Sequence, residues 1–195
     1  MPALMSRMLL CAALAAAARP SGLVAQLDGA IPSMRLTAGT LSFDGYATVG
    51  DFTGTTTTVR GEVTGGESLP AVRGWVESPV KTLDTGDRKR DKDLNKSMES
   101  DKHPAMRFDL TGAAPQGVPG DTAVVALQGR LTLHGVTRDV TLPGKIWREG
   151  DALRLRSDFP LDLRDYEIGG LSKMLGMLRM QERIDVHVDL TFAAR

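Results

Sequence analysis

Cysteine is almost absent from this chain of 195 residues, in which Cys11 is the single cysteine. A disulfide framework and a metal site built from several thiolates are therefore excluded. Aromatic side chains are also few, at five Phe, two Trp and two Tyr, so aromatic rings cannot supply most of a core. The 24 Lys and Arg residues balance the 24 Asp and Glu residues. Without a basic excess, nothing in the charge favours nucleic acid or an anionic lipid surface as a partner.

Long apolar runs are missing as well. A membrane-spanning helix needs about 20 consecutive apolar residues. The most apolar segment, Met8 to Ala18, has 11 residues and follows a start whose only charge is Arg7. This pattern is typical of a secretory signal peptide, cut after Ala25 or, alternatively, after Ala17 or Ala18. A buried alanine-rich helix is the other interpretation. We expect removal of residues 1–25, hence a periplasmic protein without a stable membrane anchor.

The remaining chain, residues 26–195, is expected to form one domain. Cys11 would leave with the signal peptide, and Leu10 before it is too large for a lipoprotein cleavage site. Loss of Arg7 and Arg19 would leave 22 basic residues against 24 acidic ones. A chain of this size is long enough for one barrel or sandwich with a proper core. Neither an internal repeat nor a linker divides it.

Apolar and polar residues alternate through most of the domain, which is the pattern of strands with one buried face and one wet face. Four apolar rows show it: Leu41, Phe43, Gly45, Ala47 and Val49; Val125, Leu127, Gly129, Leu131 and Leu133; Leu153, Leu155, Phe159, Leu161 and Leu163; and Ile184, Val186, Val188, Leu190 and Phe192. Glycine-containing turns separate the rows. The pattern predicts an all-β fold, a single antiparallel barrel or sandwich.

Two segments break this alternation and are predicted as short helices. Thr85 to Ser100 is dense in charges of both signs and has Leu94 and Met98 one helical turn apart, which favours a solvated surface helix over a binding patch. Gly169 to Met180 carries a helical apolar stripe. This second helix would either plug one barrel end or act as a lid, because methionine adapts to irregular apolar ligands.

The stretch Gln128–Pro143 indicates a tight hairpin whose turn lies at His134 to Thr137. Leu131 and Leu133 would point to one side and Arg130, Thr132 and His134 to the other, while Val140 and Leu142 oppose Asp139 and Thr141. The stretch resembles the hairpin signature of the YceI family. Arg90–Leu94, 38 residues upstream, and His103–Phe108 resemble two further landmarks of that family, in the right order. The resemblance covers roughly Thr40 to Phe192.

The resemblance implies a lipocalin-like antiparallel barrel of about eight strands that binds a long apolar lipid in the periplasm. A polyisoprenoid or quinone-like chain is the first expectation, and a fatty-acid derivative the second. The expected ligand-binding residues are the inward apolar residues Leu41, Phe43, Leu127, Leu131, Leu153, Leu155, Phe159, Val186 and Val188, with Met174, Leu175 and Leu178 over the mouth. No cofactor is expected, and a homodimer is left open.

Small residues at several strand positions give a second reason to expect a ligand. They are Gly45, Ala47, Gly54, Gly61, Gly74 and Gly129. Barrel interiors normally need large side chains to reach close packing, so some of these positions would leave space. The alternative is that glycine marks a bend or bulge at a barrel corner.

Catalytic patterns are poor, so an enzyme is not expected. His103, His134 and His187 stand singly in the sequence and are expected on the surface, without the spacing of a metal site. A serine-nucleophile elbow and a phosphate-binding loop are also missing. Two other functions stay open. One is an accessory protein of the envelope that docks a membrane redox partner, and the other is an enzyme or haem binder that uses His134 or His187.

Overall fold

The computed structural model describes residues 30–48, 50–117, 121–169, 172–173 and 178–194. In chain order the described elements are β1 (Met34–Gly45), β2 (Phe52–Thr56), β3 (Arg60–Thr64), η1 (Leu69–Ala71), β4 (Arg73–Pro79), η2 (Val80–Thr82), α2 (Arg88–Ser97), β5 (Ala105–Gly117), β6 (Thr122–Leu133), β7 (Val136–Glu149), β8 (Ala152–Asp162), η3 (Leu163–Tyr166), β9 (Ser172–Lys173), β10 (Leu178–Arg179) and β11 (Arg183–Ala194). Within these residues, no helix has the length and apolarity needed to cross a membrane.

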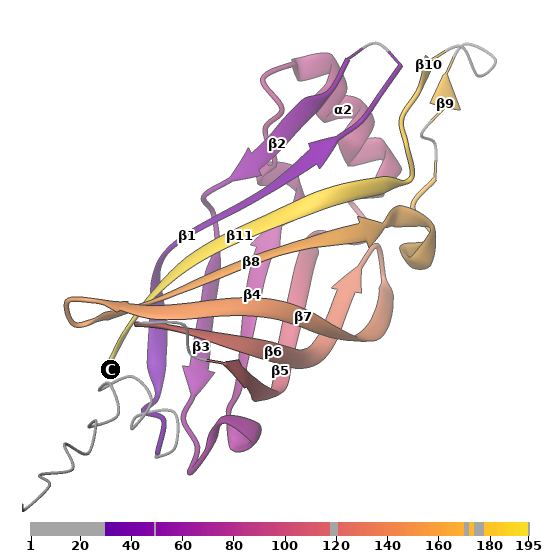
Figure 1. The fold of residues 1–195 in the computed structure, drawn as a ribbon. Helices are drawn as coiled ribbons and strands as arrows, with labels where there is room; N and C mark the ends of the chain where they lie inside the picture. Colours follow the sequence, from indigo (N-terminus) through magenta and orange to yellow (C-terminus); the bar gives the residue numbers. More distant parts are fainter. Residues whose placement is uncertain (1–29, 49, 118–120, 170–171, 174–177, 195) are drawn as a thin grey trace, which may run out of the picture.

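The described strands form a closed antiparallel barrel (Figure 1). Neighbours follow the order β11-β8-β7-β6-β5-β4-β3-β1, and β11 pairs again with β1 to complete a circuit of eight strands. β2 pairs with the carboxyl-terminal half of β1, and β3 pairs with its start. Full closure leaves no unpaired edge in the circuit. The predicted all-β barrel of about eight strands is confirmed.

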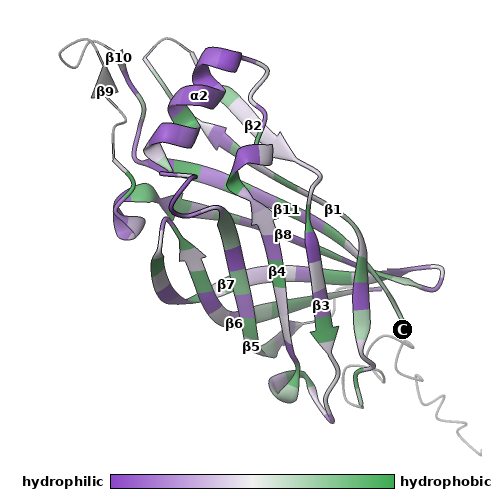
Figure 2. Ribbon diagram, turned by 180° about the vertical axis from the view of Figure 1, so that it is seen from behind, coloured by the Kyte–Doolittle hydropathy of each residue, from purple (hydrophilic) through white to green (hydrophobic). Residues whose placement is uncertain are grey.

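The two ends of the barrel differ. α2, β2, β9 and β10 gather at one end, and the carboxyl terminus lies at the other (Figure 1). We call the first of these the α2 end; it also includes the β6–β7 turn and η3. In Figure 2, α2 is coloured mostly hydrophilic, and green apolar bands alternate with polar ones along the strands.

The β6–β7 hairpin shows why the alternation was readable from the sequence. Leu131 and Leu133 are buried and Arg130 is exposed, because successive strand residues point to opposite faces. The turn is shorter than predicted, since Leu133 pairs with Val136 and only His134 and Gly135 lie between them. Their φ angles are +51° and +78°, the backbone that tight two-residue hairpins require.

The first predicted helix is present as α2, and its cap is a side chain near the predicted start. Asp87 accepts hydrogen bonds from the amides of Lys89 at 2.8 Å and Arg90 at 3.0 Å, which satisfies two otherwise unpaired donors. These bonds also hold the pKa of Asp87 below its usual value. The predicted surface helix is therefore confirmed, and it contacts the core through Leu94 and through Met98 just after its end.

The second predicted helix, Gly169 to Met180, is contradicted by the residues of that segment that the structure describes. Ser172–Lys173 pair antiparallel with Leu178–Arg179 as β9 and β10. Hydrogen bonds to the chain after β1 fix this strand geometry: the Thr48 amide donates to the Arg179 carbonyl at 3.0 Å, and the Gln181 amide donates to the Tyr46 carbonyl at 2.8 Å. Three glycines in the segment also weaken a helix. Contacts with a distant part of the chain thus override the helical stripe.

The buried side chains form a continuous lining along the barrel. Near the carboxyl-terminal end, Ile146, Leu190 and Phe192 belong to packed clusters. At the α2 end, the largest cluster includes Phe43 and Tyr166 and is joined by partly buried side chains such as Leu41 and Phe159. Most of the partly buried members at this end, together with buried ones such as Phe43, border the cavity described next.

Candidate functional site

A cavity of about 440 Å³ lies inside the barrel and reaches the α2 end. Eight of the predicted wall residues line it: Leu41, Phe43, Leu127, Leu131, Leu155, Phe159, Val186 and Val188. They come from β1, β6, β8 and β11, so four strands far apart in the sequence contribute to one wall. The volume lies in the range of pockets that hold small ligands.

Four predicted residues are not placed in this wall. Leu153 packs with the clusters that contain Ile146 and Phe192, so its strand face was predicted correctly, but it is not among the cavity-lining residues. Met174 and Leu175 lie outside the described residues, and Leu178 is described only as a strand residue paired with Lys173.

Several cavity residues were not predicted. Met106, Phe108 and Leu110 line it from β5, and their spacing of two was the signal available in the sequence. Leu94 and Met98 line it from α2 and the residue after its end. Their one-turn spacing was noticed, but a helix dense in charge hides which face it buries. Other lining residues missed by the sequence analysis are Phe52, Leu83, Ile168, Met180, Ile184, Leu190 and Phe192.

The small strand residues do not leave the cavity in the simple way expected. A Cβ at Gly54 would lie 2.6 Å from Phe43 Cζ, and one at Gly45 would lie 2.6 Å from Phe52 Cζ. These glycines therefore accommodate aromatic rings from the neighbouring strand. The rings of Phe43 and Phe52 meet edge to face, with centroids 6.0 Å apart, an arrangement favoured by aromatic quadrupoles.

Charged residues surround the apolar cavity where α2 covers it. The Arg90 guanidinium lies 4.4 Å from the centroid of the Phe52 ring, so one cation caps one of the lining aromatics. Lys89, Asp93 and Arg179 also border the cavity at this end. An elongated molecule could therefore keep an apolar tail inside and a polar group at the rim.

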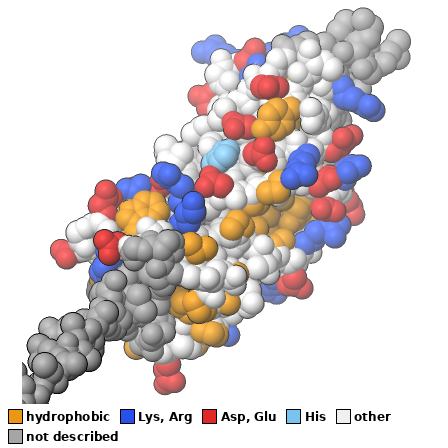
Figure 3. All heavy atoms as spheres, in the orientation of Figure 1, with side chains coloured by type: hydrophobic (Ala, Val, Ile, Leu, Met, Phe, Trp, Pro, Cys, Tyr) orange, Lys and Arg blue, Asp and Glu red, His pale blue; other side chains and the backbone are white. Residues whose placement is uncertain are grey.

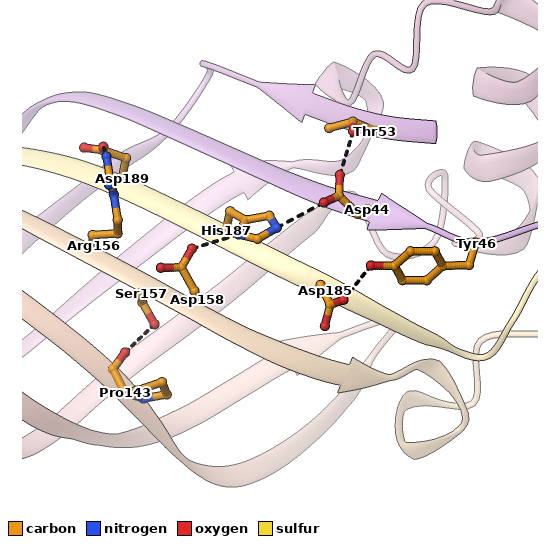
Figure 4. A network of polar contacts seen from close by, with 10 residues as sticks. All are labelled: Asp44, Tyr46, Thr53, Pro143, Arg156, Ser157, Asp158, Asp185, His187 and Asp189. Carbon is orange, nitrogen blue, oxygen red and sulfur yellow. Dashed lines mark hydrogen bonds and ion pairs between the residues drawn. The ribbon is translucent and has the colours of Figure 1, made fainter. Parts of the chain in front are cut away.

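The outer face of the barrel carries a separate polar network (Figure 4). His187 Nδ1 lies 2.7 Å from an Asp158 carboxylate oxygen, and His187 Nε2 lies 3.3 Å from Asp44. Asp44 also accepts a hydrogen bond from Thr53 at 2.6 Å, the largest cause of its lowered pKa. Asp158 is the main cause of the raised pKa of His187, and Asp44 adds to it.

His187 is 42% exposed, which confirms its predicted place on the polar face of the last strand. Charges of both signs spread over the face shown in Figure 3, with hydrophobic side chains between them.

Neither His187 nor His134 is among the cavity-lining residues, so the haem or enzyme function suggested for them finds no support in the cavity.

His134 is not the exposed turn residue that the sequence predicted. Its side chain is only 13% exposed, and its ring meets that of His103 with centroids 5.1 Å apart. The backbone of η3 covers it, because His134 Nδ1 lies 3.1 Å from the Tyr166 carbonyl oxygen. Burial of a turn residue by a segment 32 positions away leaves no signal in the local sequence.

The sequence matches the YceI-like domain over residues 34–192. The chain belongs to the YceI-like family. This confirms the resemblance drawn from the hairpin and its two upstream landmarks. Among curated proteins, no significant match is found.

Solved structures show the same fold at low sequence identity. A polyisoprenoid-binding domain from Saccharophagus degradans aligns with a TM-score of 0.70 and 15% identity, covering 85% of this chain and all of that one. Burkholderia cenocepacia BcnA aligns at 0.65 and 17%, covering 78% and 95%. A YceI protein of Campylobacter jejuni aligns at 0.50 and 15%, covering 63% and 72%. At identities this low, the structural alignments establish a common fold and nothing further.

Proposed function

We propose that this YceI-like protein binds a long apolar lipid chain in its barrel cavity and shields it from water. The apolar cavity at the α2 end carries the proposal. Most of its lining surface is apolar, although charged side chains such as Glu62, Glu77 and Arg107 are also among the lining residues. A mostly apolar wall suits a hydrocarbon better than a polar metabolite. The structural similarity to a domain described as polyisoprenoid-binding supports a polyprenyl or quinone-like chain ahead of a fatty-acid derivative.

The binding energy would come from removing the chain from water. Each buried methylene contributes about 0.8 kcal/mol, so about ten of them contribute roughly 8 kcal/mol before the costs of association. Phe43, Phe108 and Phe159 supply broad contact surfaces that need no fixed ligand geometry. Binding by shape and burial of this kind requires no chemical step.

The charged rim would hold the polar end of the lipid. Lys89, Arg90 and Arg179 border the cavity at the α2 end, where an anionic or hydrogen-bonding head group would stay in contact with water. Removal of residues 1–25 and residence in the periplasm complete the proposal, since that segment has the features of a signal peptide.

The direct test is to identify what the protein carries. Native mass spectrometry of untagged protein isolated from its own host, followed by organic extraction, is expected to reveal a bound prenyl or acyl lipid. A fluorescent prenyl probe should then bind to delipidated protein. The proposal would be refuted if no lipid copurified and the delipidated protein bound neither the prenyl probe nor a fluorescent fatty-acyl probe.

A matched pair of variants locates the binding. Val188→Phe places extra volume on the cavity wall and is expected to weaken the probe's affinity at least tenfold. Thr141→Phe adds the same ring on an exposed position of β7 and should leave the affinity unchanged. Thermal melting shows that both variants are folded. Equal affinity in the two variants would place the lipid outside the barrel.

A further inference from the structure

Two histidines and a glutamate far apart in the sequence meet at the α2 end, outside the cavity wall. Glu99 lies in the turn after α2, His103 precedes β5, and His134 lies in the β6–β7 turn. One ligand atom from each lies within 4.8 Å of the other two. The Glu99 Oε2 atom is 3.9 Å from His134 Nε2 and 4.0 Å from His103 Nε2. These distances are too long for hydrogen bonds, and the three ligand atoms lie around a common centre.

The tautomer of the neutral His134 ring is set by the contact of Nδ1. Nδ1 lies 3.1 Å from the Tyr166 carbonyl oxygen, and a carbonyl can only accept a hydrogen bond, so Nδ1 carries the proton. The lone pair of the neutral ring is then on Nε2. Metal-binding histidines are commonly oriented in this way by a backbone carbonyl on the opposite nitrogen.

His134 Nε2 has no hydrogen-bond partner among the described residues although it is buried. A buried polar atom left without a partner is unfavourable, and here it is an acceptor directed toward a carboxylate. Two acceptors do not bind each other, but a cation between them satisfies both. The unpartnered Nε2 atom thus supports a cation site here independently of the clustering.

His103 is held in place by its backbone and by a glycine. Its amide donates to the Glu99 carbonyl at 2.9 Å, which closes the turn between the two residues. Its ring lies over Gly135, where a Cβ would be 2.5 Å from His103 Cε1. Gly135 also has φ +78°, so both the turn and the ring require glycine at this position.

The geometry points to a site for one divalent transition-metal ion, bound by Glu99, His103 and His134. Two imidazoles and one carboxylate are a donor set suited to zinc, whereas calcium and magnesium prefer oxygen ligands. In a tetrahedral zinc site, ligand atoms at about 2.0–2.1 Å from the ion are roughly 3.3 Å apart. Side-chain movements of well under 1 Å would bring these three atoms into position, with the fourth position open to water.

Lys102 competes with the ion for the carboxylate. Its ammonium group lies 2.9 Å from Glu99 Oε2 and is the main cause of the lowered pKa of Glu99. The Lys102 side chain is 71% exposed, so it can turn into water when a metal displaces it. Removal of Lys102 should therefore strengthen metal binding, an effect that a merely structural histidine pair would not produce.

The ion would join three segments that border the cavity. Glu99 follows Met98, and His134 follows Leu133, both of which are lining residues. Through Tyr166, His134 also contacts the segment that leads to Ile168, another lining residue. A bound metal would thus brace the α2 end of the barrel without entering the lipid site.

Titration calorimetry of the untagged full-length protein with zinc chloride tests the site. The wild type is expected to bind one equivalent and to melt at a higher temperature with zinc. His103→Ala, His134→Ala and Glu99→Gln should each weaken binding at least tenfold and reduce that shift, whereas Lys102→Gln should strengthen binding. Because Glu99 is exposed, its variant remains informative if a histidine variant fails to fold.

His187→Ala is the matched control, since the two nitrogens of His187 face different carboxylates and cannot both serve one ion. It should bind zinc as the wild type does. Absence of zinc binding by the wild type would overturn the proposal. So would binding that persists unchanged in the Glu99 and histidine variants, or that is lost only in the His187 variant.

Discussion

The ring of Phe43 lies against Gly54, its direct partner across the β1–β2 ladder. A side chain at residue 54 would occupy the place of the ring, with its Cβ 2.6 Å from Phe43 Cζ. The ring also lines the cavity, so a side chain at residue 54 would press it toward the space proposed for the lipid. Stability and ligand binding are therefore linked at this contact.

Gly54→Ala is expected to push the Phe43 ring into the cavity. Overpacking of this kind costs about 1 kcal/mol or more, which lowers the melting temperature by roughly 2–4 °C for a domain of this size. The affinity for a prenyl probe should fall as well. Gly169→Ala is the control, because a Cβ at residue 169 meets nothing within 4 Å. Identical melting temperatures and affinities for both variants would contradict this contact.

The inward face of β6 is expected to reject a charge. Leu131→Asp would place a carboxylate at a residue that is 9% exposed, at a cost of about 3 kcal/mol or more. Thr132→Asp changes the adjacent outward residue, whose hydroxyl meets that of Thr137 at 2.9 Å, and should be mild. Denaturant unfolding of both variants checks the strand register. A larger loss of unfolding free energy in Thr132→Asp than in Leu131→Asp would show that the assigned register is inverted.

His187 is expected to make stability depend on pH. Its folded pKa is raised above the ordinary value of 6.5, chiefly by the Asp158 carboxylate and further by Asp44. A raised pKa means that the contribution is complete below about 6.5 and disappears as the pH rises through the folded pKa. The wild type should therefore lose stability relative to His187→Gln as the pH rises above about 6.5. Parallel stability curves for the two proteins, measured by denaturant unfolding, would argue against this ion network.

α2 is expected to contribute to lipid affinity from the rim of the cavity. Leu94→Asp replaces a lining side chain with a hydrated charge, and loss of contact with about two methylenes costs roughly 1.6 kcal/mol, or more than tenfold in Kd. Lys92→Asp changes an exposed residue of the same helix and should bind the probe as the wild type does. Fluorescence titration distinguishes the two variants. Equal Kd values for Leu94→Asp and Lys92→Asp would show that α2 does not contribute to the binding site.

Export is expected to remove residues 1–25. Amino-terminal sequencing of protein from the periplasmic fraction should begin at Gln26, with cleavage after Ala17 or Ala18 as the alternative. Recovery of the protein from the cytoplasm with Met1 in place would refute export.

The barrel itself was predictable because alternation is a local property. In a strand, residues two apart share a face, so the rows through Leu131 and Val186 already marked the inward side. The hairpin at Gly135 was equally local, since a glycine between two alternating runs encodes its own turn. These signals needed no knowledge of which strands would be neighbours.

Features that depend on distant neighbours were decided only by the tertiary structure. Residues 172–173 and 178–179 form strands because the chain after β1 supplies hydrogen bonds that outweigh a helical stripe. Gly54 holds a ring because Phe43 faces it across a ladder. His103 and His134, each unremarkable in its own segment, become a candidate metal site with Glu99 because barrel closure brings a helix end beside a hairpin turn.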